Sequence, residues 1–109
     1  MKNAGPQHPE RRKHPRFTYE VNQRPILRAY DRKYHVINIS KGGITIQSRP
    51  DSLPLTTSWL EGSIMFLDGE TSKITGDIAW IIGDKMGVKF SNPLPDATIS
   101  REHSRIEKA

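Results

Sequence analysis

The chain has 109 residues, of which 34% are hydrophobic and 27% are charged, and it carries a net charge of +5. This composition favours one small β-rich domain over a large enzyme, and the lack of cysteine excludes disulfides, thiol catalysis and cysteine-bound metals. The sequence has no apolar signal region and no apolar run near the roughly 20 residues of a membrane helix. We therefore expect a cytoplasmic protein that does not engage a membrane.

The chain begins with a polar tail and a basic arm. Residues 1–9 are almost free of apolar side chains and are expected to be disordered. The arm, residues 10–17, belongs to a segment that holds most of the net charge, because residues 1–16 contain five basic residues and one acidic residue. Such local basicity suits a small anionic ligand better than duplex DNA, which usually meets a broader basic face.

The arm is expected to be an extended strap. Pro15 disfavours a helix through these residues, so the arginines should splay along the chain. Guanidinium groups pair bidentately with phosphate or with the edge of guanine. For this stretch alone, a solvated basic tail or a remnant of an expression vector is an equally good interpretation.

Alternation of apolar and polar residues predicts short strands along most of the remaining chain. The strands are expected at residues 17–21, 25–30, 33–39, 44–48, 62–67, 72–82 and 86–90. The second run is either separate or a continuation of the first after a break at residues 22–23. Turns are expected at residues 31–32, at 41–43 with a positive φ, at 68–69 and at 83–84.

The remaining segments are a loop and a helix. Residues 49–61 are expected to form a loop that is held against the barrel by its apolar side chains, namely Leu53, Leu55, Trp59 and Leu60. A short helix is expected from Asp96 to about residue 107, with Ile99 and Ile106 on its apolar side.

These elements predict an all-β fold, a six-stranded antiparallel β-barrel with a flexible N-terminal arm and a short C-terminal helix. We expect residues 1–9 to be a tail and residues 10–109 to form a single domain. Alternation also assigns faces. In the strand at residues 33–39 and its end, one side should carry Val36, Asn38 and Ser40. In the strand at residues 72–82, one side should carry Ile74, Gly76, Ile78, Trp80 and Ile82.

The sequence offers no recognisable catalytic or metal-binding pattern. The four histidines have no metal-ligand spacing, and no nucleophile elbow or phosphate-binding glycine loop is present. Most acidic residues fall at predicted turns or on outward positions, where solvation explains them better than acid–base pairing. We therefore expect a protein that is not an enzyme and that holds no metal or cofactor.

A polar turn at residues 38–43 is the second candidate for binding. Asn38 and Ser40 offer an amide and a hydroxyl, while Gly42 and Gly43 allow a ligand to approach the backbone closely. For this hexapeptide alone, an ordinary hairpin with local hydrogen bonds is the better interpretation.

Taken together, the arm and the turn resemble the signature of the PilZ domain family. Arg12 and Arg16 match its Arg-x-x-x-Arg motif, and residues 38–43 match its Asp/Asn-x-Ser-x-x-Gly motif. Residues 76–80 are similar to the family's Gly-x-Val-x-Trp strand, and residues 86–90 to its Leu-Gly-Val-x-Phe strand. The resemblance covers roughly residues 10–92 and implies a six-stranded barrel that binds the bacterial second messenger cyclic di-GMP.

The resemblance also implies roles for individual residues. Arg12 and Arg16 would grip guanine edges and phosphates, and Asn38, Ser40 and Gly43 would read a guanine and the ring phosphates, with Asn38 in place of the more frequent aspartate. Arg11 extends the first motif, which in the family accompanies an intercalated ligand dimer. Trp80 would either line the ligand surface or pack the barrel.

Three functions follow from these patterns. The first is a cyclic di-GMP receptor that orders its arm and passes the signal to an unidentified downstream protein. The second is a small barrel that binds single-stranded nucleic acid, although three Phe, three Tyr and two Trp are few for stacking along a groove. The third is a PilZ-type interaction module without a ligand.

Overall fold

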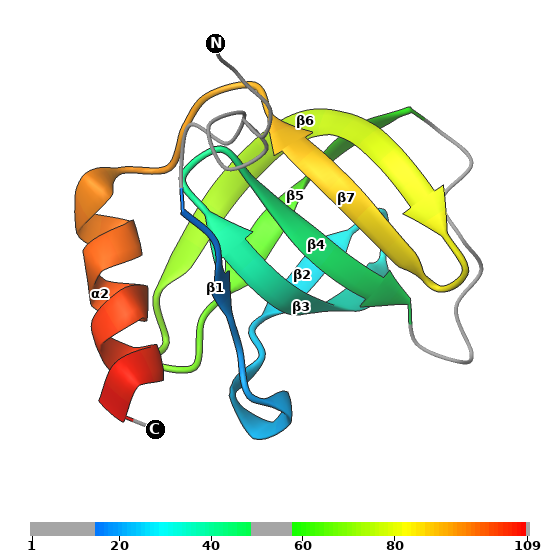
Figure 1. Ribbon diagram of the computed structural model, residues 1–109. Coiled ribbons are helices and arrows are strands. Elements are labelled where there is room, and N and C mark those ends of the chain that lie inside the picture. Colours follow the sequence, from blue (N-terminus) through cyan, green and yellow to red (C-terminus); the bar gives the residue numbers. More distant parts are fainter. Residues whose placement is uncertain (1–14, 49–57, 109) are drawn as a thin grey trace, which may run out of the picture.

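The structure, a computed structural model, describes residues 15–48 and 58–108 (Figure 1). The expected tail, most of the basic arm with Arg11 and Arg12, and the loop residues 49–57 with Leu53 and Leu55 lie outside the described residues. The described elements are β1 (Phe17–Thr18), the 3-10 turn η1 (Val21–Gln23), β2 (Ile26–Ala29), β3 (Arg32–Ser40), β4 (Gly43–Ser48), β5 (Trp59–Met65), β6 (Thr71–Ile82), β7 (Lys85–Phe90) and α2 (Asp96–Lys108).

The strands close into a six-stranded antiparallel barrel, which confirms the predicted fold. The neighbours run in the order β3, β2, β5, β6, β7 and β4, and β4 pairs again with β3. The short strand β1 is an additional strand on β3, and α2 is the C-terminal helix, which lies beside β1 (Figure 1). No described residue belongs to a helix that is long and apolar enough to cross a membrane.

β1 and β2 are two strands that follow one another along the same edge of β3. Phe17 pairs with Ile39, and further along β3 Ile26 pairs with His35. Between them the chain leaves the edge at η1, where the Gln23 amide donates to the Glu20 carbonyl at 2.8 Å. The two runs are therefore separate strands, and the first ends at Thr18, earlier than predicted.

A β-bulge in β3 changes the predicted faces. The register shifts between Val36 and Asn38, and both Val36 and Ile39 are fully buried. In a regular strand, side chains alternate between the faces, so two residues three positions apart would point to opposite sides. Both point inward here because the bulge adds one residue between them. The prediction that Val36 shares a face with Asn38 and Ser40 is therefore wrong: Val36 lies in the core.

A second bulge, between Ile78 and Trp80 in β6, acts in the same way. Ile74 and Gly76 are buried, and Ile78 packs against the core. Beyond the bulge Trp80 pairs with Gly87 on the outer side of the sheet, and Ile82 is 71% exposed. The predicted single face thus holds up to Ile78 and fails at Trp80 and Ile82.

Several boundaries and turns also differ from the prediction. β5 begins at Trp59, so Trp59 and Leu60 belong to a strand rather than to the loop; Leu60 is fully buried but Trp59 is 43% exposed. The turn after β2 has positive φ at Tyr30 and Asp31, one residue earlier than expected, and the turn at residues 41–43 has no positive φ. The other two predicted turns are confirmed, with φ of 94° at Gly69 and 60° at Gly83.

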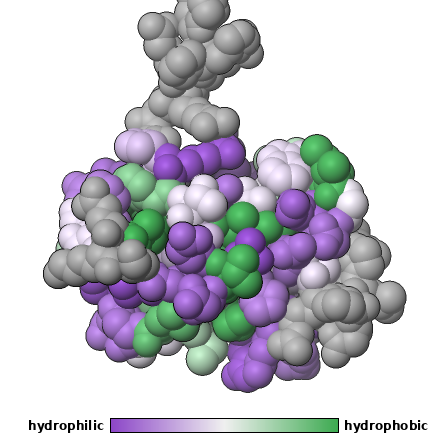
Figure 2. Space-filling model, turned by 60° about the horizontal axis from the view of Figure 1, so that its bottom comes forward, coloured by the Kyte–Doolittle hydropathy of each residue, from purple (hydrophilic) through white to green (hydrophobic). Residues whose placement is uncertain are grey.

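The barrel core is apolar and α2 packs against it. Ile99 and Ile106 contact this core, as predicted, and Leu94 just before the helix is buried. Figure 2 shows a face on which hydrophobic residues reach the surface in separate patches among hydrophilic ones. The large hydrophobic side chains exposed on described residues are Val21, Tyr30, Trp59, Met65, Leu67, Ile81 and Ile82.

Candidate functional site

A hollow of about 540 Å³ lies on the outside of the barrel, over β3, β4, β7 and β6. Its lining includes every predicted ligand-binding residue that the structure describes, namely Arg16, Asn38, Ser40, Gly42, Gly43 and Trp80. Arg11 and Arg12 were predicted for the same site and lie outside the described residues. The fold therefore gathers residues from distant parts of the sequence on one surface.

Pairing between β1 and β3 brings Arg16 to the polar turn. Phe17 faces Ile39 in the antiparallel ladder, so Arg16, one residue earlier, lies next to Ser40, one residue later. Arg16 is exposed and makes no ion pair with a described residue. Its guanidinium is therefore available to an anion in the hollow.

Ser40 holds the turn together. Its side chain is largely buried, and its hydroxyl donates to the Gly43 carbonyl and accepts from the Gly42 amide, both at 3.3 Å. The local hydrogen bonds expected of an ordinary hairpin are thus present. Because Ser40 also lines the hollow, the same hydroxyl lies where a ligand could meet it.

The turn is fixed to its surroundings by backbone contacts. The Phe90 amide donates to the Gly42 carbonyl and the Leu94 amide donates to the Lys41 carbonyl, both at 2.8 Å. A Cβ on Gly43 would overlap the Val88 carbonyl oxygen, so only glycine lets β4 approach β7 this closely. The floor of the hollow is therefore rigid before any ligand arrives.

Trp80 forms an aromatic wall of the hollow rather than part of the core. A Cβ on Gly87 would overlap the indole of Trp80, which means that the ring lies directly over this glycine. The indole is half-buried and outside the buried core cluster. A flat ring next to a polar turn can stack on a planar base.

The charge of the hollow is positive. Among its described lining residues Arg16 and Lys89 are cationic, and none carries a carboxylate. Lys89 was not predicted as a site residue, because a lysine at an outward position of a strand is usually only solvated. Its partner across the ladder is Gly43, and that pairing is the signal that places it beside the polar turn. The hollow thus combines two cations, hydrogen-bonding groups and an aromatic face, which suits an anion with planar rings.

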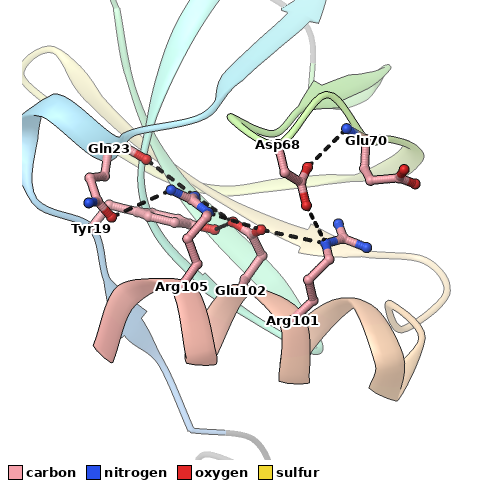
Figure 3. A network of polar contacts seen from close by, with 7 residues as sticks. All are labelled: Tyr19, Gln23, Asp68, Glu70, Arg101, Glu102 and Arg105. Carbon is pink, nitrogen blue, oxygen red and sulfur yellow. Dashed lines mark hydrogen bonds and ion pairs between the residues drawn. The ribbon is translucent and has the colours of Figure 1, made fainter. Parts of the chain in front are cut away.

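Outside the hollow, a buried polar network joins the chain after β1, including η1, to α2 (Figure 3). Glu102 is fully buried, and its carboxylate accepts from the Tyr19 hydroxyl at 2.7 Å and from Arg105 at 2.7 Å. Arg105 also donates to the Gln23 carbonyl at 3.4 Å. The sequence reasoning missed this network.

The network holds Tyr19 and Arg105 in their protonated forms, in which both donate hydrogen bonds to Glu102. Burial, and then the hydrogen bond to Glu102, raises the pKa of Tyr19, which therefore stays a donor. The hydrogen bond to Glu102 raises the pKa of Arg105. Two residues before Tyr19, Phe17 stacks on His103 of α2 with ring centres 4.2 Å apart. The chain just after Arg16 is therefore attached to the helix.

The described residues contain no group of three or more His, Cys, Asp or Glu that could hold a metal.

Comparison with known families gives a match over nearly the whole chain. The family model described as the PilZ domain matches residues 10–106 of the 109 residues. No curated protein matches the chain.

Proposed function

This chain belongs to the PilZ domain family, and from that premise we propose that it is a bacterial, cytoplasmic receptor for cyclic di-GMP. PilZ domains are ligand-binding receptors rather than enzymes, and cyclic di-GMP is the ligand known for the family. The observation that carries the proposal is the hollow itself, which joins Arg16, the turn at residues 38–43 and Trp80 without a carboxylate in its described lining.

The proposed contacts follow from the chemistry of each side chain. Arg12 and Arg16 bind phosphate and guanine edges through charge-assisted hydrogen bonds. Asn38 and Ser40 supply directional bonds to a guanine, Gly42 and Gly43 offer backbone amides, and Trp80 stacks on a base. Ligand binding orders the arm, residues 10–17, and a downstream protein then reads the docked arm.

Titration calorimetry tests this function. Purified protein is titrated with cyclic di-GMP and separately with a single-stranded oligonucleotide, and amide exchange in the arm is followed with and without saturating ligand. Heat with cyclic di-GMP and slower exchange in the arm support the receptor. Heat with the oligonucleotide alone supports the nucleic-acid barrel, and no heat with either supports an interaction module without a ligand.

The first prediction concerns stoichiometry. Two stacked cyclic di-GMP molecules carry four phosphate charges, so Arg11 beside Arg12 would offset part of their repulsion. We expect two ligands per protomer in the wild type, and about one, or a weaker second site, in Arg11→Ala. Lys2→Ala removes a charge from the same end of the chain and should leave both sites intact. A wild-type ratio of one would refute the dimer.

The second prediction concerns Lys89. Its ammonium group borders the hollow but is exposed, so a phosphate contact there is partly screened by solvent. We expect Lys89→Gln to weaken cyclic di-GMP binding by roughly threefold to tenfold at low salt, and by less as the salt concentration rises. Lys85→Gln is the matched control on the same strand, outside the hollow. Equal affinities for the two variants would contradict the contact.

A further inference from the structure

The barrel surface outside the hollow carries three cations in register across four strands. In the ladders Lys33 pairs with Arg28, Arg28 pairs with Ser63, and Ser63 pairs with Lys73. These four residues, here named the cationic row, cross β3, β2, β5 and β6 on their outer faces. The hollow lies over β4, β7 and the other ends of β3 and β6, so the two surfaces share no residue.

The row places like charges side by side, with no ion pair to a described residue. Neighbouring strands are about 4.8 Å apart, so Lys33 and Arg28 are direct cross-strand neighbours and Lys73 lies roughly 10 Å beyond Arg28. Lys33, Arg28 and Lys73 are all exposed, and the structure records no ion pair between any of them and a described residue. Like charges directly opposite each other destabilise a sheet. An anionic partner would relieve this repulsion.

The surroundings of the row limit what that partner can be. On one side the next residues of the same strands are Ile26 and Met65, and the Met65 side chain is 42% exposed. On the other side stand the exposed carboxylates of Asp31 and Glu61. A nucleic acid or an anionic membrane would also bring negative charge against these carboxylates and be repelled by them. A partner with a narrow anionic stripe and an apolar edge would contact the row without reaching them.

We propose that the cationic row docks an acidic amphipathic helix of a partner protein. A helix rises about 1.5 Å per residue, so acidic residues at i, i+4 and i+11 share one face at about 6 and 16 Å from the first. Those spacings match the roughly 5 and 15 Å that separate Arg28 and Lys73 from Lys33 across the strands. Apolar residues on the adjacent face of that helix contact Met65 and Ile26. This surface is independent of the cyclic di-GMP site.

The test uses a synthetic helical peptide with glutamate at i, i+4 and i+11 and leucine on the adjacent face, and its binding is measured by fluorescence anisotropy at low salt. We expect Arg28→Glu and Lys33→Glu each to weaken binding by about tenfold or more. Lys85→Glu, an exposed strand lysine outside the row, should change it by less than about twofold. Each reversal also places opposite charges in register, so neither variant should melt below the wild type.

Several outcomes overturn the proposal. One is equal peptide affinity for Arg28→Glu, Lys33→Glu and Lys85→Glu. Another is unchanged binding when the glutamates of the peptide are replaced by glutamine. A third is tighter binding of a single-stranded oligonucleotide or of anionic phospholipid vesicles, if that binding is lost in Arg28→Glu, because the row would then serve nucleic acid or membrane. If one reversal fails to fold, the other gives the answer, and Lys73→Gln gives it without reversing a charge.

Discussion

We expect Arg16→Ala to weaken the binding of cyclic di-GMP by roughly tenfold to a hundredfold. Arg16 is the arm residue that the structure places at the hollow, next to Ser40 at the end of β3. A lost charge-assisted hydrogen bond costs about 1.5–3 kcal/mol, and 1.4 kcal/mol is a factor of about ten in affinity. Arg12→Ala should act in the same direction if the arm folds over the hollow as proposed.

The control for Arg16→Ala is Arg28→Ala. Both arginines are exposed, but Arg28 lies on β2, on the other side of the barrel from the hollow. Arg28→Ala should keep the affinity of the wild type, and both variants should keep its melting temperature because neither side chain packs in the core. Calorimetry that shows near-wild-type affinity for Arg16→Ala would remove the main residue from the proposed site.

Ser40→Ala is a less direct test of the same site. The hydroxyl already bonds Gly42 and Gly43 within the turn, so its loss changes the turn as well as any ligand contact. Lower affinity with an unchanged melting temperature would indicate a ligand contact. A large loss of stability with intact affinity would indicate that the hydroxyl serves the turn alone.

The sequence predicted the barrel well because strand alternation is a local signal. Seven apolar–polar runs and the glycine turns at residues 69 and 83 were enough to place the strands. The two bulges were not predictable in this way. The position of the extra residue in β3 and in β6 depends on the closure of the barrel, which is a tertiary effect. Alternation alone therefore put Val36 and Trp80 on the wrong faces.

The site shows the same division between local pattern and tertiary contact. The arm and the turn carry recognisable motifs, and the hollow brings their described residues together. Lys89 has no motif of its own and gains its place only through its pairing with Gly43. Glu102 looks like a solvated helix residue, yet it is fully buried, because Tyr19 approaches it from the chain after β1 while Arg105 pairs with it from the next turn of the same helix.

We expect Glu102→Ala to cause the largest loss of stability of the variants considered for this protein. The carboxylate is fully buried on α2, accepts from Arg105 of the same helix, and links that helix to Tyr19 just after β1 (Figure 3). Removing one member of a buried charged network leaves the others without partners, which costs about 3–5 kcal/mol. For a domain of this size, such a loss lowers the melting temperature by about 12 °C or more. Glu102→Gln should lose less, because its amide oxygen can still accept from Tyr19.

Glu70→Ala is the matched control, since Glu70 is exposed and its backbone amide, which bonds Asp68, is kept. It should shift stability by no more than about 0.5 kcal/mol. A double-mutant cycle with Tyr19→Phe then measures the coupling between Tyr19 and Glu102. If the hydroxyl acts through Glu102, its loss costs much less stability in the Glu102→Ala background than in the wild type. Equal melting temperatures for Glu102→Ala and Glu70→Ala would contradict a structural role for the network.

Because Glu102 does not line the hollow, Glu102→Ala should still bind cyclic di-GMP below its melting temperature. A fall in stability with intact affinity would show that the network holds the helix rather than the ligand.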